Sequence, residues 1–168
     1  MTNPAEELLD VVDEHDRVIG TAPRGEVYRD GLTHRCVFIL VRDPAGRIFV
    51  HRRTDTKLFA PGMHDMFVGG VVGAGETYAS AAVREAEEEL GVRGIEPRPL
   101  FKFLFRQEGL SWWCDLYEAE WDGPVSPQES EVAWHAWLTP AELDERLARD
   151  EFVPDGLEAY RRYQELRG

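Results

Sequence analysis

Apolar runs separated by polar turns predict a succession of short strands along most of this chain. The run at residues 36–41 is almost continuously apolar, as expected for a strand buried on both faces of a sheet. Near the start of the chain, two apolar runs flank a polar turn and predict a β-hairpin. The strands expected from this pattern cover residues 8–12, 18–22, 36–41, 47–53, 66–72, 100–106, 110–119 and 132–137.

Helix signals fall between these strands. A short helix is expected at residues 23–28, and a longer one should end at Gly91, which suits a left-handed C-cap. Thr139 followed by Pro140 is typical of an N-cap and a first helical residue. A last amphipathic helix is expected at about residues 156–166. This order of elements predicts an α/β fold, in which helices cover the faces of a mixed sheet.

Length and composition indicate a single globular domain. The chain has 168 residues, of which 43% are hydrophobic and 30% are charged, and this is enough to form a substantial core. We divide it into an N-terminal extension of hairpin and short helix at residues 1–31, a core at residues 32–143 and a C-terminal helix at residues 144–168. Neither an internal repeat nor a low-complexity segment interrupts this order.

Charge and cysteine content narrow the possible partners and compartments. The net charge of −13 disfavours a nucleic-acid or anionic-membrane partner, since either would require clustered Lys and Arg. Cys36 and Cys114 each lie in an apolar, strand-like run and are expected to be small buried residues without a disulfide. We find no signal-peptide pattern and no apolar run that could cross a bilayer. The sequence therefore favours the cytoplasm.

The most informative stretch is a glycine-rich turn followed directly by an acidic helix. Each helical residue advances by about 100°, so Glu85, Glu88 and Glu89 should fall on one narrow face. Like charges at this spacing repel each other, and a cluster of carboxylates suits a hard cation such as Mg²⁺ or Mn²⁺. The adjacent face should pack against a core through Ala79, Val83, Ala86 and Leu90.

This stretch resembles the Nudix box, in which glycine, glutamate and arginine positions have a fixed spacing. A complete match of this length is much more specific than an acidic helix alone. The resemblance implies an α/β/α sandwich with a mixed sheet, and hydrolysis of a phosphoanhydride bond in a diphosphate substrate. The fixed positions of the box fall on Gly70, Glu76, Arg84, Glu85, Glu88, Glu89, Gly91 and Val92.

The resemblance also implies roles for these residues. Glu88 and Glu89 correspond to dependable metal ligands, Glu85 to a ligand or a general base, and the carbonyl of Gly70 to a further ligand. Mg²⁺, or Mn²⁺, is the implied cofactor. Either a glutamate of the helix, such as Glu85 or Glu89, or a nearby loop carboxylate would accept the proton of the attacking water.

Three further box or loop residues have two possible interpretations each. Glu76 and Arg84 resemble the family's structural pair, although exposed ion pairs of no consequence are common. Gly91, a further fixed position of the box, has a single interpretation as the residue that ends the helix. Glu131 precedes a strand at which related enzymes often place an extra catalytic carboxylate, and it is otherwise a solvated loop charge.

The densest basic patch lies upstream of the box. Arg52 and Arg53 are neighbours on a predicted strand, so at most one of them should point into a cleft. One of these arginines, or Lys57 in the following loop, could bind the outer phosphate of the substrate, and the alternative is a solvated charge. Aromatic residues of the second predicted hairpin, Trp112 among them, could stack on a ring but are more typical of a core.

Two other functions remain as alternatives. Residues 12–14, His34, residues 51–53 and residues 59–62 are similar to a branch that includes isopentenyl-diphosphate isomerase. However, the isomerase cysteine position falls on Gly69. A non-catalytic nucleotide-sensing domain is the second alternative, but it would be expected to have an eroded box.

Nucleoside di- or triphosphates are the default small-molecule substrates, and a homodimer is common among relatives.

Overall fold

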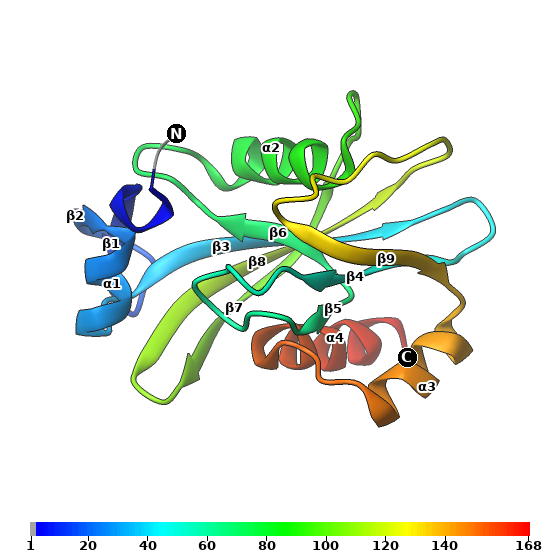
Figure 1. Ribbon diagram of the computed structural model, residues 1–168. Helices are drawn as coiled ribbons and strands as arrows, with labels where there is room; N and C mark the ends of the chain where they lie inside the picture. The colour runs from blue at the N-terminus through cyan, green and yellow to red at the C-terminus, as the bar shows by residue number, and fades with distance from the viewer. Residues whose placement is uncertain (1–2) are drawn as a thin grey trace.

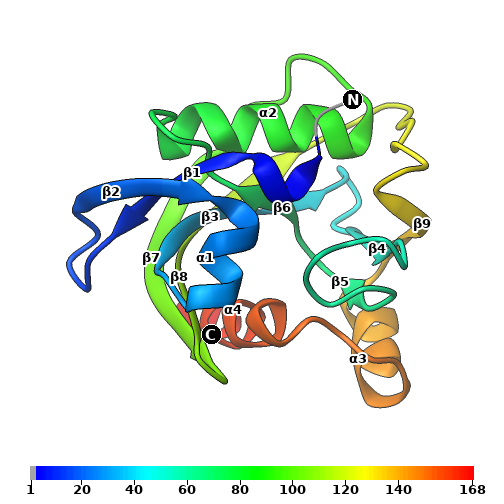
Figure 2. The same ribbon diagram turned by 60° about the vertical axis from the view of Figure 1, so that its left-hand side comes forward.

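The computed structural model describes residues 3–168 and begins with an N-terminal unit that has its own two-stranded sheet. A short 3₁₀ helix, η1 (Pro4–Glu6), leads into the antiparallel pair β1 (Leu8–Val12) and β2 (Val18–Pro23). Helix α1 (Arg24–Asp30) follows and ends at Gly31 in the left-handed conformation. This unit lies at one end of the molecule, as Figures 1 and 2 show in blue. The predicted hairpin and short helix are therefore confirmed.

A mixed seven-stranded sheet forms the centre of the molecule. Its long strands β3 and β8 run parallel to each other, whereas the other paired strands are antiparallel. The strand order is β5-β4-β3-β8-β7, with β6 paired to β3 and β9 paired to β4. The strands are β3 (His34–Arg42), β4 (Ile48–Arg53), β5 (His64–Asp65), β6 (Val68–Val71), β7 (Arg98–Gln107), β8 (Leu110–Glu120) and β9 (Val132–Leu138).

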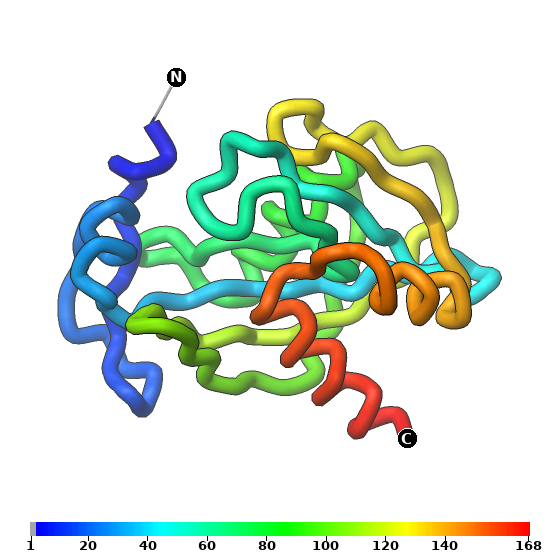
Figure 3. Tube along the Cα trace, turned by 60° about the horizontal axis from the view of Figure 1, so that its bottom comes forward, coloured from blue at the N-terminus to red at the C-terminus, as the bar shows by residue number. Residues whose placement is uncertain are grey.

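Helices cover both faces of this sheet and complete an α/β/α sandwich. Helix α2 (Tyr78–Leu90) lies on one face, and α4 (Pro154–Arg167) crosses the opposite face after α3 (Pro140–Arg149) (Figures 1 and 3). Thr139 caps α3 with its side chain, as the sequence predicts. Between residues 3 and 168, none of the helices has the length and apolar character needed to cross a bilayer.

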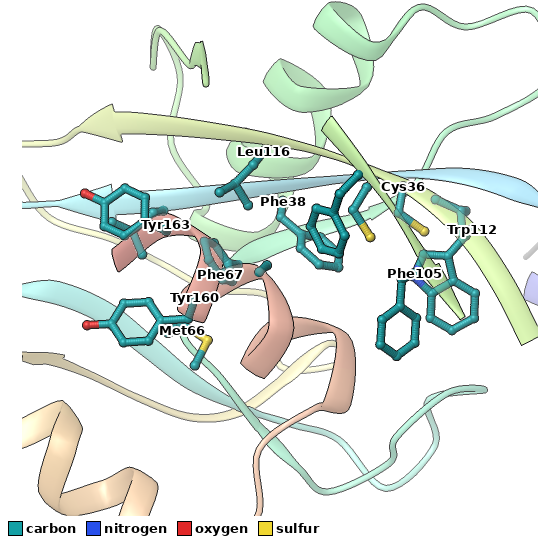
Figure 4. Close-up of a cluster of buried hydrophobic side chains, with 14 of the residues drawn as sticks. Cys36, Phe38, Met66, Phe67, Phe105, Trp112, Leu116, Tyr160 and Tyr163 are labelled. Carbon is teal, nitrogen blue, oxygen red and sulfur yellow. The ribbon is translucent and has the colours of Figure 1, made fainter. Parts of the chain in front are cut away.

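The sheet divides the core into two clusters because side chains alternate along each strand. On β3, Val37 and Ile39 join the cluster under α2, whereas Cys36 and Phe38 join the cluster under α4. Figure 4 shows the α4-side cluster, where Tyr160 and Tyr163 lie against aromatic and sulfur-containing side chains of the sheet. Burial of β3 on both faces confirms the prediction from its continuous apolar run.

The orientation of α2 differs in part from the sequence prediction. Val83 is 38% exposed, and Ala79 in the first turn is exposed as well. Ala86 and Leu90 are fully buried as predicted, together with Ala81 and Ala82, which the sequence interpretation did not include. The buried face is therefore rotated away from Val83, towards the glutamates. Glycine on the facing strand β6 makes room for this rotation, as described below.

We predict that Gly91→Ala destabilises the protein more than Gly94→Ala does. Both glycines have positive φ, at 66° and 85°, so each substitution should cost about 1–2 kcal/mol from backbone conformation alone. A Cβ at Gly91 would lie 1.9 Å from the carbonyl oxygen of Ser126, whereas nothing lies within 4 Å at Gly94. Urea denaturation should show an additional loss of about 1–3 kcal/mol for Gly91→Ala. Equal losses in the two variants would contradict this steric explanation.

Candidate functional site

The site begins where α2 lies against the backbone of β6. A Cβ added at Gly70 would lie 2.8 Å from both Cδ and Oε1 of Glu85. The carboxylate therefore occupies the space that a side chain at position 70 would fill, and any residue other than glycine would displace it. Val37 on β3 pairs with Gly70 and fixes this segment in the sheet. The glycine that precedes the acidic helix thus allows close contact between helix and strand.

Glu85 and Glu89 form a pair of buried acids at this contact. Burial raises the pKa of Glu85 to about 7, against the opposing effect of the Arg84 charge. Burial also raises the pKa of Glu89 well above its ordinary value, and the charge of Glu85 raises it further. Oε2 of Glu89 is buried and has no hydrogen-bond partner among the described residues. Both observations indicate negative charge that the surrounding protein does not compensate.

Glu88 lies at the rim of this pair. Its side chain is 49% exposed, and its closest basic contact is a 3.5 Å approach of Arg84 Nη1 to Oε2. Across residues 3–168, no three His, Cys, Asp or Glu side chains are gathered closely enough to hold a metal ion. The structure thus buries Glu85 and Glu89 together and leaves Glu88 at the rim, where it shares Arg84 Nη1 with Glu85 and raises the pKa of that acid. The Glu89 oxygen without a hydrogen bond and the Glu85 carboxylate against the Gly70 backbone nevertheless fit a hard divalent cation, which prefers oxygen ligands.

Arg84 joins this acidic helix to the loop that precedes it. Its Nε lies 2.7 Å from Oε2 of Glu76, and its Nη2 lies 2.8 Å from Oε1 of the same side chain. Its Nη1 donates to Oε1 of Glu85 at 2.8 Å. The pair predicted from the sequence is therefore a bidentate contact with a third bond to the acidic site. Such a planar fork fixes the orientation of both carboxylates more strongly than a single contact would.

Basic residues approach the acidic pair from β4 and the following loop. The charge of Lys57 lowers the pKa of both Glu85 and Glu89 against the effect of burial, and Lys57 also forms an ion pair with Glu131. The charge of Arg53 acts on Glu89 in the same direction. Arg52 precedes Arg53 on β4, but the pairing with β9 is irregular between these two residues, so strand alternation does not fix the direction of Arg52. The structure brings Arg53, Lys57 and Glu131 towards the site, and the charge of Arg52 is not among the main influences on the pKa of Glu85 or Glu89.

A cavity on the α4 side of the sheet contains residues that sequence reasoning missed. Gly69 and Gly70 line part of it. Trp112 and Asp155 line it as well, and Nε1 of Trp112 donates to Oδ2 of Asp155 at 3.2 Å. Burial raises the pKa of Asp155 to about 6 and that of Asp65 to about 8. No local motif signals these residues, because they come from elements that are far apart in the chain. The missed lining residues are Arg24, Tyr28, Asp65 and Asp155.

Gly69 has a backbone that excludes a side chain. Its φ is 157°, and a Cβ there would lie 1.9 Å from the carbonyl oxygen of Val37. Val37 belongs to the central strand β3, which cannot move without disturbing both core clusters. The strand β6 therefore offers two successive positions without side chains, each for a different steric reason.

Comparisons with known proteins agree with this architecture. The family model for the NUDIX domain matches residues 32–162. An uncharacterized Nudix hydrolase of Streptomyces coelicolor is 60% identical over 171 residues, covering 100% of this chain and 94% of its own length. The uncharacterized Nudix hydrolase YfcD of Escherichia coli is 43% identical over 91% of this chain and 84% of its own. The crystal structure of DR0079 from Deinococcus radiodurans has 34% identity and a TM-score of 0.81, covering 93% of this chain and 98% of the other.

We predict that Asp65→Asn makes the protein less sensitive to rising pH. Because the pKa of Asp65 is raised from 3.8 to about 8 in the folded state, folding binds a proton between these values. The stability of the natural chain should therefore fall as pH rises through this window, by at most about 1.4 kcal/mol per pH unit for this one group.

The measurement is urea denaturation at several pH values between 5 and 8. Asn retains an acceptor for the Phe67 N–H, which donates to Asp65 Oδ1 at 2.9 Å. Asp122→Asn, at an exposed position, is the matched control and should follow the natural chain. A constant difference in stability between Asp65→Asn and the natural chain across this range would refute the interpretation.

Proposed function

Because the chain belongs to the Nudix hydrolase family, we propose that it uses a divalent cation to hydrolyse a nucleoside diphosphate-linked or other organic diphosphate. Family membership establishes the reaction class, which is hydrolysis of a phosphorus-containing anhydride. The observation that supports the metal requirement is the buried pair of acids, with Glu85 against Gly70 and one oxygen of Glu89 without a hydrogen bond among the described residues.

Four groups would hold the cation in this proposal. They are the carboxylates of Glu85, Glu88 and Glu89 and the carbonyl of Gly70. Mg²⁺, or Mn²⁺, suits this set because all of the donors are oxygens. When bound, the cation would neutralise phosphate charge and lower the pKa of a water molecule. Glu88 contributes from the rim, where its side chain is held only by the long contact to Arg84.

The proton of the attacking water would pass to a carboxylate of this chain. Glu85, Glu89 and Glu131 are the candidates, and each interacts with Lys57. Lys57 contacts Glu131 and acts electrostatically on Glu85 and Glu89, so it lies between the loop carboxylate and the helix carboxylates. This arrangement supports a shared site in which Lys57 opposes the effect of burial and favours the charged form of the neighbouring acids, the form that acts as a base.

Arg53 and Lys57 would bind the phosphate groups, and the cavity would bind the second part of the substrate. Arg53 lines the cavity and also acts on Glu89, so it links the two regions. Tyr28, Phe59 and Trp112 give this cavity aromatic walls, but its volume of about 50 Å³ holds a complete base only if side chains move. Nucleoside di- and triphosphates, the default substrates of the sequence analysis, are the substrates we would test first. A cytoplasmic location, where nucleotides and Mg²⁺ both occur, fits this proposal.

Neither alternative function gains support from the site. An isomerase of the related branch would need its cysteine at position 69, where the backbone leaves no room for a side chain. Burial raises the pKa of Cys36, the cysteine in the cavity, far above its ordinary value, so its thiol is not activated. A non-catalytic sensor would not need the buried, uncompensated acids that the site retains.

We predict that activity requires Mg²⁺ and the acidic pair. Glu89→Gln and Glu85→Gln should each lower kcat by at least about a hundredfold, because each removes a charge that holds the cation. Glu88→Gln should also lower kcat, though less. Phosphate or mononucleotide release from a panel of nucleotides, nucleotide sugars and prenyl diphosphates would measure this.

Glu87→Gln is the matched control on the same helix, since Glu87 bonds to the Gly94 N–H outside the site. It should remain as active as the natural chain. Full turnover of the folded Glu85→Gln and Glu89→Gln variants, or turnover in excess chelator, would show that the metal assignment is wrong.

We predict that Arg53→Gln and Arg52→Gln differ in their effect on KM. Arg53→Gln should raise KM for the diphosphate substrate about tenfold, as expected for loss of one charge-assisted hydrogen bond. Arg52→Gln should leave KM within about twofold, because Arg52 is not among the charges that act most strongly on Glu85 and Glu89. Steady-state kinetics, with thermal melting to verify folding, would compare them. The opposite ranking would place the phosphate on the other face of β4.

A further inference from the structure

The N-terminal hairpin contacts the glycine-rich loop at three successive residues. Leu9 forms an antiparallel bridge with Gly73. The N–H of Ala74 donates to the carbonyl of Leu8 at 2.9 Å. The N–H of Gly75 donates to Oδ2 of Asp10 at 3.0 Å. Residues 8–10 therefore pair with residues 73–75, in the loop that leads into α2.

Asp10 contributes its side chain to this contact, whereas the contacts of Leu8 and Leu9 are made by backbone atoms. The contact can therefore be tested by substituting Asp10. This residue is only 7% exposed, and its acceptor meets Gly75, whose φ of 76° lies in the left-handed region. A backbone N–H in such a turn cannot rely on a helix or sheet for its acceptor. A carboxylate supplies a stronger hydrogen bond than a neutral group. Asp10 therefore holds the loop at Gly75, where the backbone is left-handed.

A second contact joins the hairpin turn to the first residue of α2. Asp16 accepts a hydrogen bond at 2.8 Å from the hydroxyl of Tyr78, the residue at which α2 begins. Asp16 is also paired with Arg35 at 2.7 Å and with Lys102 at 2.5 Å, and its side chain is 7% exposed. The hairpin is thus anchored to the sheet while it holds both the loop and the helix that follows it.

Hydrogen bonds continue from this loop to the acidic site. The N–H of Gly73 donates to Oε1 of Glu76 at 3.0 Å. Glu76 forms the bidentate pair with Arg84, and Arg84 donates to Glu85. A displacement of the loop would therefore move Glu76, then Arg84, and then the carboxylate beside Gly70. The family model begins only at residue 32, so the hairpin lies outside the region that defines the family.

We propose that the N-terminal hairpin, residues 8–23, is a part of the active site in this protein, with Asp10 as a positioning residue. It holds the loop at residues 73–75 and, through Glu76 and Arg84, sets the position of Glu85. This inference rests on the proposed metal-dependent function of Glu85. It assigns a task to a segment that contributes no ligand and that the family model does not include.

The test compares Asp10→Ala with Asp10→Asn in the full chain. Ala removes the acceptor for the Gly75 N–H, whereas Asn keeps a carbonyl oxygen in its place. Asp10→Ala should lower kcat on the order of tenfold and raise the half-saturating Mg²⁺ concentration by a similar factor, with KM for the diphosphate little changed. Asp10→Asn should restore both values to within about threefold. Asp30→Ala is the control, because Asp30 lies in the same N-terminal unit, is exposed, and pairs with Arg29.

Two measurements do not depend on turnover. Mn²⁺ affinity, measured by electron paramagnetic resonance with Mn²⁺ alone, should fall in Asp10→Ala and recover in Asp10→Asn. Amide hydrogen exchange at Ala74 and Gly75 should become faster in Asp10→Ala only. If Asp10→Ala does not fold, Asp10→Glu, which keeps the charge but displaces the oxygen by one methylene, serves the same comparisons.

The outcomes separate this inference from the proposed function. A natural chain that binds Mn²⁺ but hydrolyses no diphosphate would refute the function, while the affinity and exchange data would still test the hairpin. Asp10→Ala should also be combined with Glu76→Gln. If the double variant loses no more activity than the poorer of the two single variants, the two residues act through the same hydrogen-bonded route, which would support the inference. Independent, multiplicative losses, or unchanged Mg²⁺ and Mn²⁺ dependence in Asp10→Ala, would overturn the inference.

Discussion

The site depends on two carboxylates that are removed from water without enough positive charge to compensate them. Burying an ionised acid is costly unless a cation or several donors replace its solvation. Glu85 receives one arginine, and one oxygen of Glu89 has no hydrogen bond among the described residues, although Nε2 of His51 lies 3.8 Å away. The fold maintains this arrangement because Gly70 admits Glu85 to the backbone of β6, and because small alanines let α2 approach the sheet closely. Affinity for a divalent cation would follow from this unfavourable charge.

Rigid surroundings keep the acids where they are. Strand β3 is buried on both faces and separates the two core clusters, and β6 is paired to it opposite Gly69 and Gly70. Arg84 then joins the helix to the preceding loop through Glu76, and Asp10 of the N-terminal hairpin accepts a hydrogen bond from the same loop. The acidic pair is consequently supported from the sheet, from the loop and from its own helix, and little of this support comes from solvent-exposed contacts.

Local signals in the sequence predicted most of the fold. The apolar run of β3, the Thr139 cap and the terminal Gly91 each depend on neighbouring residues, and the structure confirms all three. Orientation of α2 was only partly predicted, because helical periodicity cannot tell which side of an apolar face meets the sheet. The acids of the cavity, Asp65 and Asp155, could not be found at all, since only the tertiary fold brings β5 and α4 together.

The paired glycines of β6 have an evolutionary consequence. The proposed hydrolytic site lies on the α2 side of this strand, whereas the aromatic cavity lies on the α4 side. Under this proposal, the residues of α1, β5 and α4 that line the cavity could change during evolution without disturbing the carboxylates across the strand. Substrate preference could then change while the hydrolytic site stays the same, and the two glycines are the positions at which substitution would be least tolerated.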